Sequence, residues 1–443
     1  MRVMVQLRSS PVSHAAATAL RPAARVTAAI ERGVGQFKAD SKYPVVQVPG
    51  VKAATGAVMS SLSQPLDFSF KPADSTYLVR GTIPDGPAQS AALAEANAHP
   101  DVVAVYSDPV IESCPICPGD PPDGTAVRVG SLLGKPILSR SGMDGRGVFV
   151  AVVDTGVNVA YLRTKGRRPK LDKARSWVPS GIATSPGNHP VDHGTMCAYD
   201  LGIMAPNAKL LDYAVLLSRT QGATAMSGLL SDAVIAYSKL RQIVSAMPAR
   251  SRAMVVTNSW GMFSPKWDFP PGHPGNYSDN PNHPFNLIVA SLEAAGADIL
   301  FAAGNCGRDC ADGRCEFGTT LPICGANSHP AVLSIAGVDL HKNRVGYSSQ
   351  GPGRLTSKKP DVASFTHFAG SGVYPADGGT SAACPVAAGV VAAFRSRHKA
   401  SQVTPAQLRS LVQRTAEDRG GRGYDFDYGW GIVDGVALKR ASR

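Results

Sequence analysis

The part of the chain that most constrains its fold follows residue 125, where short apolar stretches alternate with helix-prone ones. Stretches such as 148–153 and 299–303 are apolar throughout rather than at every second residue. Strands of this kind are typical of a parallel sheet covered by helices on both faces. The sequence therefore predicts a large α/β domain. The alternating stretches are 148–153, 209–215, 227–244, 253–258, 285–295, 299–303, 332–338 and 380–397.

Residues 1–112 are expected to form a separate, smaller α+β unit. An alternating strand at 2–8 precedes an Ala-rich helical stretch that runs to about residue 35, and 77–83 reads as a second strand. A helix at 88–99 and a strand at 101–106 complete the unit. Two stretches then lack periodicity: a Pro/Gly/Asp-rich linker at 113–124 and an insertion at 262–284.

Asp154 follows the apolar stretch 148–153 and precedes Gly156, where the chain can turn. Such a carboxylate sits where parallel sheets keep their sites, although a turn-capping Asp is an equally ordinary reading. The sequence DTG also begins the site of an aspartic protease. That site needs two such carboxylates, and since the chain has one D-[ST]-G it would need a homodimer. His193, in the sequence DHGT, can face a cleft from a loop-to-helix boundary, or be a structural histidine.

Ser381 opens a helix of small residues in the stretch DGGTSAACPVAA, with Pro385 expected in its first turn. The start of a helix stabilises negative charge and offers unpaired N–H groups, which are what a tetrahedral oxyanion requires. The alternative is that Thr380 or Ser381 is simply an N-cap.

Asn305 ends the apolar stretch ILFAAG and can donate a second hydrogen bond to such an oxyanion. Together the four segments resemble the subtilase family of serine peptidases over roughly residues 125–440, in the chain order Asp, His, Ser. The resemblance implies a subtilisin-like parallel sheet flanked by helices. It makes Asp154 the orienting acid, His193 the general base, Ser381 the nucleophile and Asn305 an oxyanion donor.

The resemblance also implies two substrate-binding stretches. One would pair with an extended peptide through main-chain hydrogen bonds, and the other would wall the pocket for the residue before the scissile bond. Their residues are Ser259, Trp260 and Gly261 in the first and Ala302, Ala303 and Gly304 in the second. Trp260 is bulkier than its counterpart in many members. HGTMCAY replaces the usual HGTHVAG, and places Cys197 where some members keep a buried thiol.

The stretch HPDVVAVYSDP (99–109) looks like the last strand of an inhibitor-type subtilase propeptide. It implies that 1–112 is a ferredoxin-like folding helper and inhibitor, joined by the linker 113–124 to a catalytic domain at 125–443. The enzyme would cut this zymogen itself between about residues 109 and 130. A permanent accessory domain is the alternative.

Four of the eight cysteines crowd into nineteen residues and could form two disulfides or a zinc site. Because their spacing lacks paired CxxC knuckles, we expect disulfides. The four are Cys306, Cys310, Cys315 and Cys324, and the others are Cys114 and Cys117 (a CxxC), Cys197 and Cys384. Cys197 and Cys384 are expected to be buried packing.

Disulfides and the family favour a secreted or extracytoplasmic location. Residues 1–20 nevertheless lack the apolar core of a signal peptide, and 1–33 faintly resemble a transit peptide. No run of eighteen apolar residues predicts a membrane span.

The formal net charge is +12, with one dense basic patch at 163–175. We read the patch as a solvated loop rather than a polyanion contact or a self-processing loop, and expect no nucleic-acid partner. The expected partners are polypeptide substrates and the N-terminal unit itself.

The chemistry needs no cofactor. Structural calcium is open, with Asp268, Asp279, Asn280 and Asn282 as candidate ligands. Acids after Asn305 suggest a preference for basic side chains; they are Asp309, Asp312 and Glu316. The competing function classes are a catalytically silent binding scaffold and a zinc-binding interaction protein.

Overall fold

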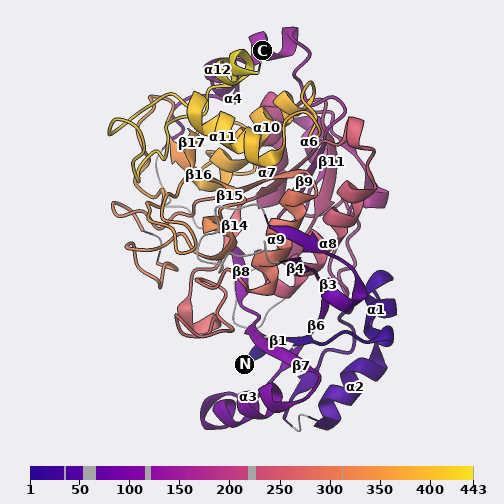
Figure 1. Ribbon diagram of the computed structural model, residues 1–443. Helices are drawn as coiled ribbons and strands as arrows, with labels where there is room; N and C mark the ends of the chain where they lie inside the picture. Colours follow the sequence, from indigo (N-terminus) through magenta and orange to yellow (C-terminus); the bar gives the residue numbers. More distant parts are fainter. Residues whose placement is uncertain (34–35, 53–65, 115–120, 218–225, 312, 443) are drawn as a thin grey trace.

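The computed structural model describes residues 1–33, 36–52, 66–114, 121–217, 226–311 and 313–442 (Figure 1). Its largest element is a seven-stranded sheet in the order β10-β11-β9-β13-β15-β16-β17, with parallel neighbours throughout. The predicted α/β fold is confirmed. The strands are β9 (Phe149–Val153), β10 (Lys170–Leu171), β11 (Lys209–Tyr213), β13 (Met254–Asn258), β15 (Ala297–Ala302), β16 (Leu333–Val338) and β17 (Val362–Phe365).

Helices cover both faces of this sheet, which explains why its strands are apolar throughout. In β9, Val150 and Val152 pack with α7 and α10, whereas Ala151 and Val153 pack with α8 and α9. The helices are α4 (Ala126–Leu132), α5 (Lys135–Arg140), α6 (Val159–Thr164), α7 (His193–Met204), α8 (Leu230–Ala246), α9 (Pro284–Ala294), α10 (Gly379–Arg395), α11 (Pro405–Thr415) and α12 (Gly435–Ala441).

The N-terminal residues form a second, antiparallel sheet in the order β2-β6-β1-β7, with β3 also paired to β6. Three helices pack on one of its faces, as the predicted α+β unit requires. The elements are β1 (Arg2–Leu7), α1 (Pro11–Thr18), α2 (Ala24–Gly33), β2 (Lys38–Ala39), β3 (Val46–Val48), β4 (Gly50–Lys52), β5 (Asp67–Ser69), β6 (Thr76–Thr82), α3 (Gln89–Ala98) and β7 (Val102–Ser107).

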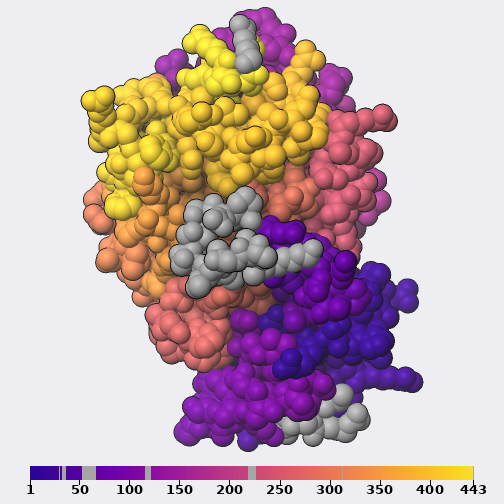
Figure 2. Space-filling model, in the orientation of Figure 1, coloured from indigo at the N-terminus to yellow at the C-terminus, as the bar shows by residue number. Residues whose placement is uncertain are grey.

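The other face of this small sheet packs against α8 and α9 (Figure 1). Along β1, Val3 and Val5 contact the unit's own helices, whereas Met4 is fully buried on the α8 and α9 side. Asp108 accepts hydrogen bonds from the main chain and hydroxyl of Ser231 in the first turn of α8, both at 2.8 Å. In Figure 2 the unit, indigo to purple, forms one end of the molecule.

The chain leaves this unit through β8 (Val110–Ser113), which enters the large domain. It lies between β12 (Ser227–Leu229) and β14 (Trp260–Gly261) and pairs antiparallel with both. Figure 1 labels β8 and β14. The apolar stretch 227–244 therefore begins with a strand and continues as α8. Of the linker 113–124, residues 115–120 lie outside the described part of the chain.

Candidate active site

Asp154 follows β9 at the carboxyl edge of the large sheet, and the chain turns sharply after it. Gly156 has φ +96°, and a Cβ there would lie 2.3 Å from the ring of His189, so only glycine fits this turn. The Asp154 carboxylate accepts the N–H of Thr155 at 2.7 Å. The turn thus fixes the carboxylate beside the next segment of the site.

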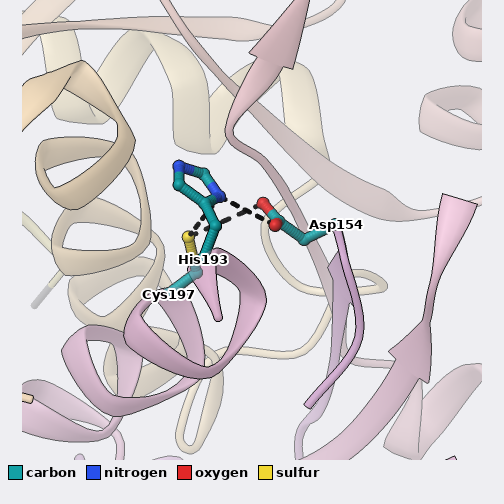
Figure 3. Close-up of side chains that lie close together, drawn as sticks. All are labelled: Asp154, His193 and Cys197. Carbon is teal, nitrogen blue, oxygen red and sulfur yellow. Dashed lines mark hydrogen bonds and ion pairs between the residues drawn. The ribbon is translucent and has the colours of Figure 1, made fainter. Parts of the chain in front are cut away.

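His193 is the first residue of α7, which Asp192 caps by accepting the His193 N–H at 2.8 Å. A Cβ on Gly194 would lie 2.5 Å from the Gly156 carbonyl oxygen, so glycine allows α7 to approach the turn after β9. This approach places His193 Nδ1 2.8 Å from Asp154 Oδ1, while the other ring nitrogen points away from Asp154 (Figure 3).

The electrostatics of this pair favour a protonated histidine. Burial by itself lowers the pKa of His193, but the charge and hydrogen bond of Asp154 outweigh it, so the pKa lies above its ordinary value. Because Nδ1 must donate to the carboxylate, the neutral ring carries its proton there, which leaves Nε2 as a base. Among the described residues Nε2 has no hydrogen-bond partner.

Ser381 lies in the first turn of α10, after the N-cap Gly378. The sequence suggested that Pro385 lies in the first turn of this helix. This is wrong, because Pro385 lies inside α10, four residues beyond Ser381. A proline there lacks the N–H that would bond the Ser381 carbonyl. That carbonyl instead accepts the hydroxyl of Ser259 at 3.0 Å and the thiol of Cys197 at 3.6 Å. The helix interruption therefore ties α10 to the neighbouring segments of the site.

Cys197 joins the three segments. Its sulfur lies 3.6 Å from Asp154 Oδ2 and 3.8 Å from His193 Nδ1 (Figure 3). It also contacts the Ser381 carbonyl. Burial, followed by the charge of Asp154, raises the thiol pKa well above its ordinary value. The group is thus a neutral thiol that packs against all three residues, and the buried packing predicted for Cys197 is confirmed.

Asn305 follows β15 and is oriented by Thr380. Its side-chain oxygen accepts the Thr380 N–H at 2.9 Å and the Thr380 hydroxyl at 2.8 Å. Because both partners donate, the bonded atom must be the amide oxygen, which turns the amide NH₂ the other way. The Thr380 hydroxyl also accepts the N–H of Gly304 at 3.1 Å. Thr380 is a positioning residue that sequence reasoning had treated only as a possible cap.

The predicted peptide-pairing strand is occupied by the chain's own β8. Trp260 pairs with Ser113 and Gly261 with Glu112, and the N–H of Cys114 donates to the Ser259 carbonyl at 3.2 Å. The same carbonyl accepts the Ser381 hydroxyl at 3.5 Å. Cys114 is thereby held beside Ser381, and Ser381 itself is fully buried.

We call the space between β12 and β14 that β8 fills the cleft. The indole of Trp260 does not line this cleft. It is fully buried on the α9 side, edge-on to Phe301 at 5.1 Å between ring centroids, while its main chain pairs with β8. The second predicted wall, Ala302, Ala303 and Gly304, is joined to the first by Asn327, whose amide donates to the carbonyls of Trp260 and Ala302. Sequence reasoning missed Asn327 and the opposite rim, β12.

The cysteine cluster pairs differently from the expectation of two internal disulfides. Cys306 and Cys315 are joined, and Cys310 is also disulfide-bonded, but Cys324 is a buried free thiol whose pKa burial raises to about 12. The bonded sulfurs cannot be zinc thiolates. Cys117 lies outside the described residues.

The candidate calcium ligands serve the insertion itself. Asp268 accepts five hydrogen bonds, from Ser107, Phe269, Tyr277 and both donors of Ser278. Asp279 and Asn280 are hydrogen-bonded within the same loop through their side chains, and Asn282 donates its main-chain N–H to Asn280. The compact group of metal-ligand residue types found among the described residues is instead Asp154, His193 and Cys197.

Comparison with known proteins decides the family. The model of the subtilase family matches residues 145–431, well over half of the chain. The chain belongs to the subtilase family. Subtilisin E of Bacillus subtilis (strain 168) is 26% identical over 318 residues, covering 69% of this chain and 68% of the relative. M-protease of Shouchella clausii (strain KSM-K16) is 28% identical over 319 residues, covering 69% and 67%.

A third relative, subtilisin of Bacillus pumilus, is 25% identical over 318 residues, which are 69% of this chain and 95% of the relative. With this family membership, and with the acid, histidine and serine all present, the subtilase is a serine endopeptidase, and its substrates are polypeptides. Within the described part of the chain, no helix is long and apolar enough to cross a membrane.

Proposed function

We propose that Ser381, His193 and Asp154 carry out peptide hydrolysis through an acyl-enzyme. Ser381 Oγ attacks the scissile carbonyl while His193 Nε2 takes its proton, and Asp154 holds the resulting imidazolium through Nδ1. His193 then returns the proton to the leaving amine, and water repeats the sequence to release the acid. The observation that carries this assignment is the 2.8 Å bond from His193 Nδ1 to Asp154, with the basic nitrogen facing away.

The oxyanion that forms on the attacked carbonyl needs donors. We assign them to the amide of Asn305 and to the N–H of Ser381, which lies in the first turn of α10 where helices leave N–H groups without intrahelical partners. The Thr380 contacts orient the Asn305 amide before the substrate arrives. In the covered form described here the Ser381 hydroxyl contacts Ser259, so it must rotate toward His193 when a substrate is attacked.

We further propose that residues 1–112 are an inhibitory propeptide, that 113–124 are a linker and that 125–443 are the catalytic domain. The burial of Ser381 and the pairing of β8 with β12 and β14 support the inhibitory role, and they favour an inhibitory tail that ends at Cys114 over one that ends at residue 112. The bond that follows Cys114 falls within the expected processing range of 109–130. The Cys306–Cys315 disulfide supports a location outside the cytoplasm.

The experiment is to express wild-type, Ser381→Ala and Ser401→Ala chains in a protease-deficient host. Ser401 is exposed and remote from the site, so it controls for the loss of a hydroxyl. The wild-type and S401A chains should shorten within 109–130 and react with a fluorophosphonate probe, whereas S381A should stay full-length and unlabelled. Shortening of S381A would assign the cut to another protease. Absence of labelling of the shortened wild type would favour the silent scaffold.

A further inference from the structure

Glu112 has its carboxylate buried inside the cleft. It lies in the middle of β8, where its main chain pairs with Ser227 on one side and Gly261 on the other. Its side chain is only 2% exposed, and Oε2 lies 3.3 Å from Nη1 of Arg314. A carboxylate this deeply buried is costly unless it has a cationic partner and hydrogen bonds. The cleft therefore contains a position built for an acidic side chain.

Arg314 is held firmly for a loop residue. The next residue, Cys315, is disulfide-bonded to Cys306, directly after Asn305. Glu316 then anchors the loop, because its N–H donates to the Phe263 carbonyl at 3.0 Å and its carboxylate accepts the Ser264 hydroxyl at 2.7 Å. The main chain next to Arg314 is thus anchored independently of β8, and the Arg314 side chain remains 30% exposed to solvent.

The register of β8 assigns this position to a substrate residue. Cys114 lies beside Ser381, since its N–H and the Ser381 hydroxyl share the Ser259 carbonyl. Burial raises the pKa of the Cys114 thiol to about 12, while the side chains of Ser381 and Thr380 lie close enough to lower this pKa in part. If Cys114 marks the residue before the scissile bond, Glu112 marks the third residue on the amino side of that bond.

The acids of the same loop do not oppose this charge. Asp309 is ion-paired with Arg344, and Glu316 with Lys266 at 3.1 Å in addition to its bond with Ser264. Asp312 lies outside the described residues. The sequence had suggested that these acids favour basic substrates, but the described side chain that reaches the cleft from this loop is the cation Arg314.

We propose that Arg314 is a specificity-determining residue that favours an acidic side chain at the third residue before the scissile bond. The proposal rests on the proposed function, because it takes β8 as a stand-in for bound substrate. An ion pair with a partly exposed arginine contributes more binding free energy than a fully exposed ion pair and less than a fully buried one. We therefore expect about a tenfold preference for Glu over Gln, and a larger one over Lys.

The experiment measures kcat/KM for three chromogenic peptides of the sequence VIXSA, which follows residues 110–114 with alanine in place of the cysteine and with Glu, Gln or Lys at X. The enzymes are the self-processed wild type, Arg314→Gln, Arg314→Glu and the control Arg308→Gln. Arg308 is an exposed arginine of the same loop. The assays run on the alkaline plateau of activity, because Arg314 also lowers the pKa of His193.

For the wild type and R308Q, kcat/KM should be highest for the Glu peptide, lower for Gln and lowest for Lys. R314Q should cleave the three peptides with similar kcat/KM, and R314E should reverse the order. High salt should shrink the wild-type preference, since the pair is reached by solvent. An unchanged ranking in R314Q would overturn the assignment of Arg314 while leaving the peptidase intact. Failure of the labelled wild type to cleave any peptide would exclude VIXSA as a substrate-like sequence and overturn the reading of β8. Failure both to label and to cleave would count against the proposed function itself.

Discussion

Replacing Thr380 by valine tests whether the orientation of the oxyanion amide is set before substrate binds. Valine has nearly the same shape but lacks the hydroxyl, so it removes the 2.8 Å bond to the Asn305 oxygen and the 3.1 Å bond from the Gly304 N–H. The bond from the Thr380 main chain to Asn305, at 2.9 Å, remains. The amide therefore loses one of its two anchors on Thr380.

The magnitude follows from these contacts. A neutral hydrogen bond contributes about 0.5–1.5 kcal/mol, so partial loss of amide orientation should lower kcat by roughly 2- to 13-fold. Complete loss of the donor in Asn305→Ala should cost about 2.7–4 kcal/mol, a magnitude known for a subtilisin and carried over from it to this chain. KM should change little, because the oxyanion exists only in the transition state.

Stability should fall as well. The Gly304 N–H is left buried without its partner, at a cost of about 1–3 kcal/mol in the free energy of unfolding. Thr380→Ser keeps the hydroxyl and is the matched control. The assay compares kcat, KM and the urea midpoint of wild type, T380V, T380S and Asn305→Ala, each titrated for active sites. A T380V enzyme with wild-type kcat beside an impaired N305A enzyme would refute the positioning role, as would T380S falling as far as T380V.

Two further predictions concern pH. Burial raises the pKa of Asp200 well above its ordinary value, as does the charge of Asp377. An acid whose pKa is raised by folding stabilises the protein while it is protonated, and this stability is lost as pH rises through the raised pKa. The Tm of Asp200→Asn should therefore rise relative to that of the wild type as the pH is raised from about 5 to about 9, and a Tm difference that does not change with pH would contradict this. Asp154 holds the pKa of His193 above its ordinary value of 6.5. As the pH is lowered, kcat/KM should therefore start to fall at a pH above 6.5, because His193 becomes protonated and can no longer act as a base. An acid limb with its midpoint at or below 6.5 would contradict this.

Much of this protein was readable from its sequence because the relevant signals are local. Apolar strands ending in Asp154 and in Gly304–Asn305 predict the edge of a parallel sheet, and a serine at a helix start predicts an anion-stabilising position. The order of the motifs then indicated the family. These features depend on neighbouring residues, so tertiary contacts had only to bring them together.

Contacts between distant segments could not be read in this way. The sequence does not show that Pro385 frees a carbonyl for Ser259, since that requires knowing where α10 begins and what faces it. It likewise could not show that Trp260 turns into the core while its main chain faces the cleft. Side-chain direction at a strand end is set by packing across the sheet.

The charge of the cleft was decided by tertiary structure alone. The sequence of the loop after Asn305 contains acids and arginines in nearly equal measure, and composition cannot tell which of them reaches the substrate. In the folded protein Arg314, next to the disulfide-bonded Cys315, pairs with Glu112, whereas Asp309 pairs with Arg344. The sequence thus predicted the candidate catalytic residues, and its prediction of the sheet that carries them is confirmed. Folding determined which charge faces the peptide, because ion pairs form between residues close in space rather than in sequence.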